Sequence, residues 1–317
     1  MVVGDIMLDR YMWGTVERVS PEAPVPVVRL KETSAAAGGA ANVAANIASL
    51  GAKPILVGIV GDDIDADELR RVLRSSNVDD STLLTVSGRP TTVKSRIVAH
   101  GQQVVRVDHE LTDPLAHDAE IMAISKLEPL IDAADAIVIS DYAKGFLTDK
   151  ILSMLIGSAE RSGKKILVDP KGKNYLKYSR ASIITPNKRE AAEACGLETC
   201  DPELIENSGN RLLGELDCSA VLITRGEEGM SLVENGGEWL HLPTTARQVY
   251  DVTGAGDTVI AAMAVSLAAG FGYQDSARLA NMAAGVVVSQ VGTTAIDARQ
   301  LQKAIDSAER TYSVSEQ

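Results

Sequence analysis

Residues 249–258 read Val249-Tyr250-Asp251-Val252-Thr253-Gly254-Ala255-Gly256-Asp257-Thr258. A strand-like stretch, 247–250, leads into the two glycines, and an Ala-rich apolar run, 259–269, follows them. This order is typical of a strand, a glycine turn and the start of a helix. A helix N-terminus presents unpaired backbone N–H groups and the positive end of the helix dipole, so the stretch predicts an anion-binding turn.

Asp257 is the unexpected residue of this turn. A carboxylate beside a phosphate-binding loop repels the ligand unless it has a task, and one task is to accept the proton of a hydroxyl that attacks the phosphate. The alternative is that Asp257 only stabilises the first turn of the helix, where acidic residues are common. From these ten residues alone, the two interpretations have equal weight.

Composition and charge limit the class of protein. The 317 residues are enough for one large α/β domain or two small ones, with 45% hydrophobic and 23% charged residues, as in ordinary globular proteins. The net charge of −12 argues against non-specific binding to nucleic acid or to an anionic membrane, so neither is expected as a partner. A local basic pocket for a phosphorylated small molecule remains compatible with that charge.

The cysteines and the N-terminal sequence indicate the compartment. Cys195, Cys200 and Cys218 are odd in number and lack CxxC spacing, which argues against a disulfide scaffold or a zinc site and favours a reducing cytoplasm. Met1 leads directly into a strand-like stretch rather than into a signal peptide. The longest apolar run, 259–271, is too short to span a bilayer and is expected to form a buried helix.

The first sixty residues alternate strand and loop signals. We expect a short strand at 1–5, followed by a loop that carries Asp9 and Arg10. Asp9 is either a ligand for sugar hydroxyls or a turn carboxylate, and the turn is the favoured interpretation. The Pro-rich stretch 21–26 predicts an extended lead into an edge strand at 27–31, and a buried strand is expected at 54–60.

Two adjacent glycines, Gly38 and Gly39, precede a helix of small residues that is expected to end near Leu50-Gly51. Small side chains allow a ligand or another backbone to come close. Asn42, one turn into that helix, has an amide that can donate to and accept from a polyol. The alternative is a tightly packed Ala-rich helix, and the double glycine favours the ligand site slightly.

Two alternating stretches, 91–99 and 103–108, flank His100-Gly101 and predict a β-hairpin after a helix at 63–76. Lys94 and Arg96 are two residues apart, so they share one face of their strand. With a three-residue loop, 100–102, Arg106 would pair with Arg96 on that face, and a loop one residue different would turn it away. Three cations on one face indicate either an anion between them or a solvated surface, with even odds.

From residue 135 onward, strands and helices alternate. Strands are expected at 136–140, 165–169, 181–185 and 220–224, and helices at 148–162, 188–194 and 202–216. This order with near-continuous apolar strands predicts a mostly parallel sheet covered on both faces, whose ligands bind at the carboxyl ends of the strands. The polar residues at those ends are Asp141, Lys144, Asp169, Lys171, Asn187, Glu190, Thr224 and Arg225.

The last third adds antiparallel strands and three helices. Strands at 230–233, 238–242 and 247–250 are expected to extend the sheet, and helices are expected at 258–269, 275–290 and 297–310. Neither a repeat nor a low-complexity linker divides the chain. We therefore expect a single domain, 1–317, with a small strand appendage formed by 10–34 and 90–110.

Several common phosphate-binding motifs are absent from the sequence. A Walker A loop requires Gly-Lys-Ser/Thr after its glycines, and no such tripeptide occurs. The dinucleotide fingerprint fails because Val259 stands where its third glycine belongs. Neither HExxH nor the protein-kinase HRD motif is present.

Three separated motifs instead resemble the ribokinase-like (PfkB) family of sugar kinases. They are Gly38-Gly39-Ala40-Ala41-Asn42-Val43-Ala44, the Asn-x-x-Glu element in Thr185-Pro186-Asn187-Lys188-Arg189-Glu190, and Asp251-Val252-Thr253-Gly254-Ala255-Gly256-Asp257-Thr258. Their order and spacing agree with the family, and the resemblance covers essentially the whole chain. It implies an ATP-dependent kinase with a three-layer α/β sandwich, a mostly parallel sheet and a small β-sheet lid.

Further stretches resemble the heptose-phosphate kinase branch of that family. They are Gly4-Asp5-Ile6-Met7-Leu8-Asp9-Arg10-Tyr11, Ser20-Pro21-Glu22-Ala23-Pro24-Val25-Pro26, Ser140-Asp141-Tyr142-Ala143-Lys144-Gly145 and Val249-Tyr250-Asp251. The branch phosphorylates D-glycero-β-D-manno-heptose 7-phosphate at O1, on the way to ADP-heptose for the lipopolysaccharide core. In many bacteria the kinase is fused to a C-terminal adenylyltransferase domain, so the resemblance implies such a domain as a fused or separate partner.

The resemblance implies roles for the phosphate-transfer residues. Asp257 corresponds to the catalytic base, and the backbone of Gly254-Ala255-Gly256 corresponds to the anion hole. This agrees with the helix N-terminus inferred from the sequence pattern. Asn187 and Glu190 correspond to the element that arranges Mg²⁺ and the ATP phosphates through water.

Other positions correspond to the nucleotide and to a second cation. Thr224 and Gly226 match the nucleotide loop, and Asn281 matches the adenine side. Asp251 and Thr253 resemble a monovalent-cation site, which implies K⁺.

The sugar side is implied in the same way. Asp9, Gly39 and Asn42 match the sugar-binding positions. The cations that resemble a clamp for the 7-phosphate are Lys94, Arg96 and Arg106. The strand appendage corresponds to the family's lid, which often forms a homodimer interface.

Two alternatives remain at this stage. One is a kinase of the same fold that acts on another sugar, such as fructose 1-phosphate or ribose. The other is a catalytically silent regulatory or binding protein that keeps only the fold. Asp257, the intact glycine turn and the Asn187/Glu190 element argue against the silent protein.

Overall fold

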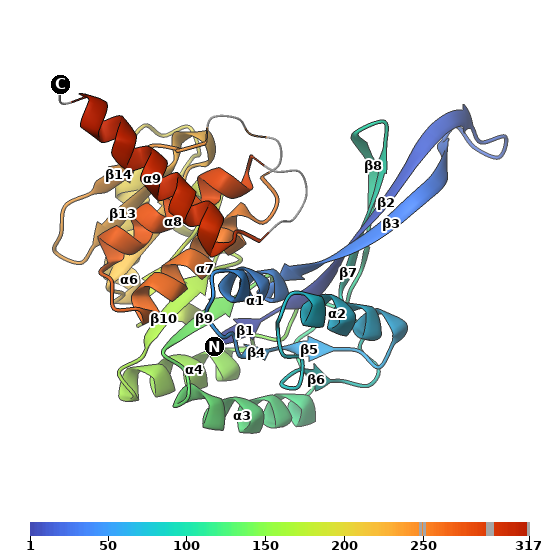
Figure 1. The fold of residues 1–317 in the computed structure, drawn as a ribbon. Helices are drawn as coiled ribbons and strands as arrows, with labels where there is room; N and C mark the ends of the chain where they lie inside the picture. Colours follow the sequence, from blue (N-terminus) through green and yellow to red (C-terminus); the bar gives the residue numbers. More distant parts are fainter. Residues whose placement is uncertain (247–248, 250–251, 290–294, 316–317) are drawn as a thin grey trace.

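An eight-stranded sheet forms the centre of the computed structural model, which describes residues 1–246, 249, 252–289 and 295–315 (Figure 1). In spatial order its strands are β14 (Leu240–Leu242), β13 (Met230–Glu234), β12 (Ala220–Thr224), β11 (Ile183–Ile184), β10 (Lys165–Asp169), β9 (Ala136–Ser140), β1 (Val2–Gly4) and β4 (Leu56–Val57). The pairs from β12 to β4 are parallel, and β13 and β14 are antiparallel. The expected mostly parallel sheet with an antiparallel extension is therefore confirmed.

Both faces of this sheet are apolar because successive strand residues point to opposite sides. Val2 packs into one buried cluster and Val3 into the other, and Val138 and Ile139 divide in the same way. Such strands need helices on both faces, since each face would otherwise expose a continuous apolar surface.

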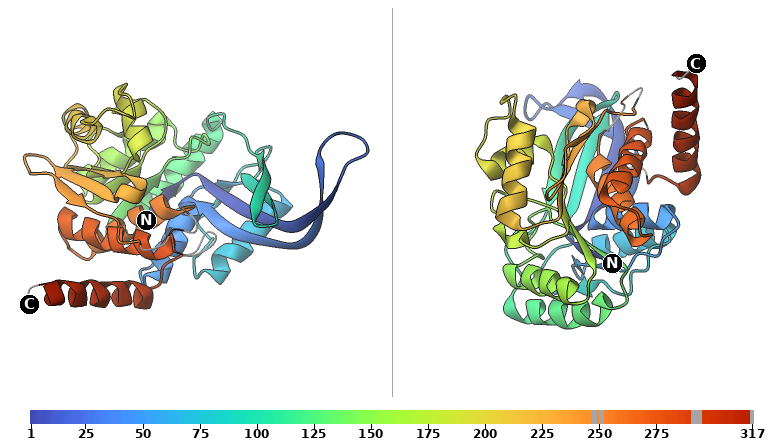
Figure 2. Two further views of the ribbon diagram at one scale, coloured as in Figure 1. Left: turned by 90° about the horizontal axis from the view of Figure 1, so that it is seen from above. Right: turned by 90° about the vertical axis from the view of Figure 1, so that its left-hand side faces the viewer.

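Helices cover the two faces, as the turned views show (Figure 2). The helices on one face are α1 (Ala40–Ser49), α7 (Ala255–Ala268) and α8 (Tyr273–Val287), and α9 (Ala298–Ser315) packs outside α8. Those on the other face are α3 (His117–Ile131), α4 (Asp149–Arg161), α5 (Lys188–Cys195) and α6 (Leu204–Leu216). The molecule is thus an α/β three-layer sandwich. Within the described residues, no helix is both long and apolar enough to cross a membrane.

A second sheet projects from this body (Figure 1). Its strands, in spatial order, are β3 (Pro26–Gly39), β2 (Ile6–Val19), β7 (Val93–Ala99) and β8 (Gln102–His109). Helix α2 (Ile64–Ser75) packs against β2 and β3, and its N-cap, Asp63, accepts from the Ala66 N–H at 2.8 Å. We call this four-stranded sheet the projecting sheet.

Two local predictions from the sequence are wrong. Asp9 and Arg10 lie within β2 rather than in a loop, because each polar side chain finds an opposite charge: Asp9 meets Arg96 and Arg10 meets Asp65. The strand expected at 54–60 is two strands separated by Gly58, since β4 joins the main sheet whereas β5 (Ile59–Val60) pairs with β6 (Leu84–Thr85). The strand expected at 247–250 falls largely outside the described residues.

The hairpin of β7 and β8 has the expected pairing for an unexpected reason. His100-Gly101 forms a two-residue turn, which alone would place Arg106 on the opposite face from Arg96. A register shift between Ile97 and Val98 adds one residue to β8, and it restores the Arg96–Arg106 pair. The turn is shorter than expected, and the bulge compensates for it.

Candidate active site

The glycine turn begins helix α7. Gly254 is the N-cap with φ of 79°, a left-handed conformation that favours glycine, and α7 starts at Ala255, three residues earlier than expected. Gly256 and Asp257 therefore lie in the first turn. A Cβ atom on Gly256 would meet no atom within 4 Å. The Ala255 N–H donates to the Val252 carbonyl at 3.2 Å, so the open space for an anion in this turn lies beside Gly256.

Asp257 is buried, with 4% exposure, and two donors hold its carboxylate. Asn42 Nδ2 donates to Oδ2 at 2.7 Å, and the Tyr142 hydroxyl donates to Oδ1 at 2.8 Å. Burial raises the pKa of Asp257 to about 6, although both hydrogen bonds lower it, and the Asp9 charge adds to the rise. The group is therefore ionised at neutral pH and basic enough to accept a proton.

Asn42 is fixed by the start of α1. Gly39 precedes the helix with φ of 56°, and a Cβ there would lie 2.5 Å from the Asp5 carbonyl oxygen, so the chain requires glycine at this position. Asn46 Nδ2 donates to the Asn42 carbonyl at 3.0 Å, and Thr258 Oγ1 donates to Asn46 Oδ1 at 3.2 Å. This buried network joins α1 to α7 and aims the Asn42 amide at Asp257.

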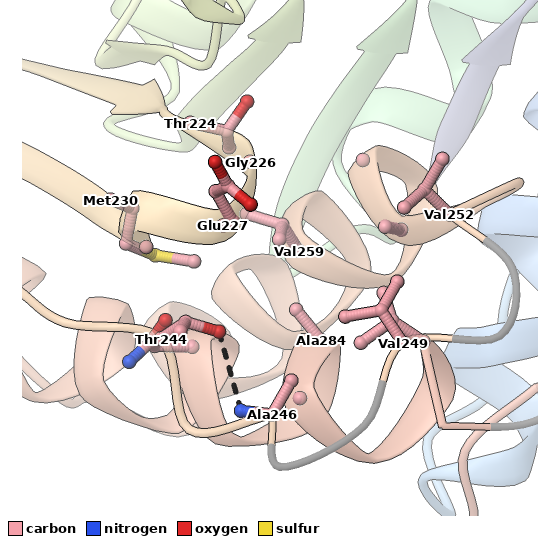
Figure 3. A pocket seen from close by; sticks show the side chains of 16 residues that line it. Thr224, Gly226, Glu227, Met230, Thr244, Ala246, Val249, Val252, Val259 and Ala284 are labelled. Carbon is pink, nitrogen blue, oxygen red and sulfur yellow. Dashed lines mark hydrogen bonds between the residues drawn. The ribbon is translucent and has the colours of Figure 1, made fainter.

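An apolar cavity of about 400 Å³ lies beside the α7 N-terminus. Figure 3 shows Met230 and Thr244 on one side of it and Val249 and Val252 on the other. Three residues expected at the nucleotide line it: Thr224, Gly226 and Asn281. The Asn281 amide itself donates to the Pro243 carbonyl at 2.8 Å. A largely apolar cavity with few polar groups suits a planar heterocycle such as adenine.

A second, polar cavity of about 230 Å³ adjoins the first, because Thr224 and Gly256 line both. Asn187 and Glu190 are in its wall, where they form a capping box at the start of α5: Asn187 Oδ1 accepts from the Glu190 N–H at 2.9 Å. Lys171 Nζ lies 2.8 Å from Glu190 Oε1. The box fixes the Glu190 carboxylate toward the carboxyl ends of the strands.

The polar cavity also carries Asp169, at the end of β10. Burial raises its pKa well above the usual range, and the Asp257 and Glu190 charges raise it further. A cation between Asp169 and Glu190 would relieve that repulsion, and carboxylate oxygens suit Mg²⁺. No group of three or more His, Cys, Asp or Glu side chains within the described residues could hold a metal, so phosphate oxygens and water would complete the coordination.

The projecting sheet brings the expected sugar-side residues to one face. In the register of the sheet, Asp9 on β2 lies opposite Lys94 on β7, and Arg96 on β7 lies opposite Arg106 on β8. Arg96 NH1 donates to buried Asp9 at 2.6 Å, and the Arg106 guanidinium binds Asp108 at 2.9 Å. Two of the three cations therefore have their own carboxylate, which the sequence pattern did not show.

Lys94 differs from the two arginines. Among the described residues no carboxylate pairs with its ammonium, which lies 5.9 Å from the Tyr142 ring centroid. Burial lowers the pKa of Lys94, and the nearby Lys144 and Arg106 charges lower it further. The Glu110 and Asp108 charges oppose this effect without forming an ion pair with Lys94, so its ammonium remains available to an anion.

Residues at the strand ends supply what the sequence motifs missed. Lys144 and Asp169 were expected at the ligand-binding ends of the strands without a specific role, and Tyr142 appeared only within the stretch 140–145 that resembles the heptose-phosphate kinases. Conversely, of the two residues expected at a monovalent cation, Thr253 lies in the turn before α7, and Asp251 is outside the described residues.

Comparison with known proteins places the chain among relatives. The profile of the pfkB family of carbohydrate kinases matches residues 1–299. The chain is 43% identical over 301 residues to Bifunctional protein HldE of Geobacter sulfurreducens and 46% identical over 305 residues to the protein of that name from Pseudomonas aeruginosa. These matches cover 95% and 96% of the chain. The chain spans 61% and 63% of the length of these relatives.

Solved structures agree on the fold. Ribokinase from Arabidopsis thaliana, complexed with ribose and ATP, matches with a TM-score of 0.77 at 22% identity, covering 96% of this chain and 97% of that one. Phosphofructokinase-2 from Escherichia coli, in complex with potassium, matches with the same TM-score at 19% identity and the same coverage. These likenesses confirm the ribokinase-like fold. Since the family profile spans nearly the whole chain and the relatives exceed 40% identity, the chain belongs to the pfkB family of carbohydrate kinases.

Proposed function

We propose that this chain is an ATP-dependent kinase that phosphorylates D-glycero-β-D-manno-heptose 7-phosphate at O1, giving the 1,7-bisphosphate on the route to ADP-heptose for the lipopolysaccharide core. The family membership and the HldE relatives support the reaction class. The observation that carries the proposal is the position of the buried base Asp257 between two different surfaces. The two cavities meet at Gly256, next to Asp257 in the chain, and Tyr142, which donates to Asp257, has Lys94 of the projecting sheet 5.9 Å from its ring centroid.

The residues divide the work of phosphoryl transfer. Asp257 accepts the O1 proton as O1 bonds to the γ-phosphorus and the bond from that phosphorus to the β–γ bridging oxygen breaks, releasing ADP. The backbone of residues 254–256, at the α7 N-terminus, stabilises charge on the transferred phosphoryl oxygens. Asn42 and Asp9 orient the sugar hydroxyls, beside the close approach that Gly39 permits. Lys94, with Arg96 and Arg106 on the same face, holds the 7-phosphate.

The nucleotide side follows the two cavities. Thr224, Gly226 and Asn281 border the adenosine end, and Asn187 and Glu190 border the phosphates. Mg²⁺, held by Glu190 and Asp169 together with water and the ATP phosphates, would neutralise charge on the β- and γ-phosphate oxygens. Lys171 keeps Glu190 in place through their 2.8 Å ion pair. A K⁺ ion at Thr253 and Asp251 belongs to the same proposal.

A substrate panel tests the proposal. We expect kcat/KM with heptose 7-phosphate to exceed that with free heptose, fructose 1-phosphate and ribose, with the new phosphate on O1 by phosphorus NMR. If one of the other three sugars equals or exceeds it, the heptose assignment fails and a kinase for another sugar remains. If ATP is consumed with none of them, the chain is a silent member of the fold.

The wider organisation is also part of this proposal. Residues 1–317 form one kinase domain, with the projecting sheet as its lid, formed by about 10–34 and 90–110. An adenylyltransferase domain, fused or separate, that acts later on the route to ADP-heptose belongs to the same proposal. The free thiols Cys195, Cys200 and Cys218 support a cytoplasmic location.

We expect a homodimer joined through the projecting sheet. Its edge strands, β3 and β8, expose apolar side chains: Leu30 is 49% exposed and Val107 is 54% exposed. An uncovered strand edge with apolar side chains attracts another strand. Light scattering at micromolar concentration should therefore give twice the mass of one chain, and Val107→Lys should give the mass of one chain.

The control for this prediction is Phe271→Lys, which removes a similarly exposed apolar side chain after α7, away from the sheet. It should leave the dimer intact. A monomeric parent protein, or a crystal dimer built from α8 and α9, would contradict the proposed interface.

A further inference from the structure

Tyr142 links the two halves of the proposed site. It follows β9, and its hydroxyl donates to Asp257 Oδ1 at 2.8 Å across 115 residues of sequence. The Asn42 amide binds the other carboxylate oxygen, Oδ2. Each oxygen keeps a further lone pair for a sugar hydroxyl, so the two donors fix the carboxylate without blocking it.

The loop that carries Tyr142 is held by an unusual anchor. The buried carboxylate of Asp5 accepts from the backbone N–H groups of Tyr142 at 2.8 Å and of Lys144 at 3.0 Å. The Arg89 guanidinium donates to the Lys144 carbonyl from the other side. Asp5 also positions α1, since its own carbonyl accepts from the Ala40 N–H at 3.0 Å. One residue thus sets the relative positions of the Tyr142 loop and the helix of Asn42.

The Tyr142 ring has a second neighbour on the sugar side. Lys94 Nζ lies 5.9 Å from the ring centroid, at the outer limit of a cation–π contact. The ring and the hydroxyl therefore face different partners: the ring faces the cation proposed to bind the remote phosphate, and the hydroxyl faces the base. Substitutions can separate these two contacts.

The surroundings of Tyr142 and Asp257 keep the Tyr142 hydroxyl protonated, so that it remains a hydrogen-bond donor. Burial raises the pKa of Tyr142 well above its usual range, and the Asp257 and Asp169 carboxylates raise it further. Tyr142 therefore stays protonated and donates at every working pH. The Asp9 carboxylate faces Asp257 and favours its protonation, and the Asp257 charge in turn raises the pKa of Asp169. The two hydrogen bonds to Asp257 oppose its protonation.

We propose that Tyr142 is a positioning residue of the kinase, whose hydroxyl holds the Asp257 carboxylate in one orientation and in its ionised form to receive the sugar proton. The inference rests on the proposed role of Asp257 as the base. It gives a task to both the Asp5 segment and the Tyr142 segment, which the proposed function leaves unassigned.

The test is the pH profile of kcat/KM for Tyr142→Phe beside the parent enzyme. kcat/KM reports the free enzyme, whose acid limb is expected near pH 6 because Asp257 must be ionised. Loss of a hydrogen bond to the charged form raises that pKa, so the limb should move about 1 to 2 pH units upward. At pH 6 kcat/KM should fall about 5- to 50-fold, and at pH 9 it should stay within about threefold. Ionisation of the substrate phosphate is common to both enzymes.

Two further variants separate the contacts. Tyr175→Phe is the matched control, because its buried hydroxyl has no partner in the described structure, and its profile should superimpose on the parent. Tyr142→Phe should keep the preference for the phosphorylated sugar, whereas Tyr142→Ala, which also removes the ring beside Lys94, should weaken it.

The outcomes distinguish the inference from the proposed function. An unshifted Tyr142→Phe profile, or an equal loss of activity at every pH, would overturn the positioning role while an inactive Asp257→Asn enzyme kept the base assignment. An active Asp257→Asn enzyme would overturn the base assignment itself.

Discussion

Asp257→Asn should lower kcat by about 100-fold or more while the affinity for ATP stays nearly unchanged. Phosphoryl transfer depends on positioning and on one group that receives the hydroxyl proton, and an amide cannot receive it. The buried carboxylate, with its pKa raised to about 6, is the group placed for that task. ATP binding rests on the neighbouring cavities and on the backbone of the turn, which the substitution leaves in place.

The control separates catalysis from helix stabilisation. Asp275 is also an acidic residue in the first turn of a helix, but it is exposed on α8 and away from both cavities. Asp275→Asn should keep full activity. Steady-state kinetics and calorimetric titration of ATP on both variants decide the matter, and an Asp257→Asn enzyme within threefold of the parent kcat would refute the assignment.

Lys94→Ala should remove most of the preference for a phosphorylated sugar. A charge-assisted hydrogen bond to a phosphate contributes about 1.5–3 kcal/mol, so kcat/KM for heptose 7-phosphate should fall about 10- to 100-fold, while that for free heptose should stay nearly constant. Lys94 is chosen because Arg96 and Arg106 already have carboxylate partners, at 2.6 Å and 2.9 Å. Binding energy from this remote group holds the O1 hydroxyl against the base.

Two comparisons sharpen that test. Lys126→Ala removes a half-buried cation on α3, outside the projecting sheet, and should leave kcat/KM for both substrates unchanged. Arg96→Ala should also reduce the preference for the phosphorylated sugar, but by a smaller factor than Lys94→Ala, because Arg96 already binds Asp9. The substitution also leaves the buried Asp9 carboxylate without its partner. An equal loss with heptose 7-phosphate and free heptose in Lys94→Ala would show that this lysine does not read the phosphate. KM for ATP should be unaffected in all three.

Local signals predicted much of the fold. The main strands show apolar runs, and α2, α4 and α5 begin at the side-chain caps Asp63, Thr148 and Asn187. Helix α3 escaped prediction because its N-cap, Ala116, makes no side-chain cap and Pro129 lies inside it. Its stability comes from packing against α4, which a sequence window does not show.

The candidate site, like the fold, was predictable only where its signals are local in the sequence. The glycine turn and its base were predictable because a helix N-terminus is a local feature with a local sequence. The Tyr142 contact was not, since it depends on where β9 ends relative to α7. Charge pairing was equally hidden: Asp9 was expected in a turn, yet it lies in β2 and neutralises Arg96. Long-range pairing decides which of several polar residues are available to a ligand.

The contacts of Asp257 also have a consequence for the order of folding. Its two hydrogen-bond donors are 215 and 115 residues away along the chain. Contacts between such distant segments form late, because a long loop must close before they contribute any stability. During synthesis Asn42 and Tyr142 emerge long before Asp257, so these donors have no carboxylate to bind until α7 has been made. The capacity for catalysis therefore appears only after α7 has been synthesised.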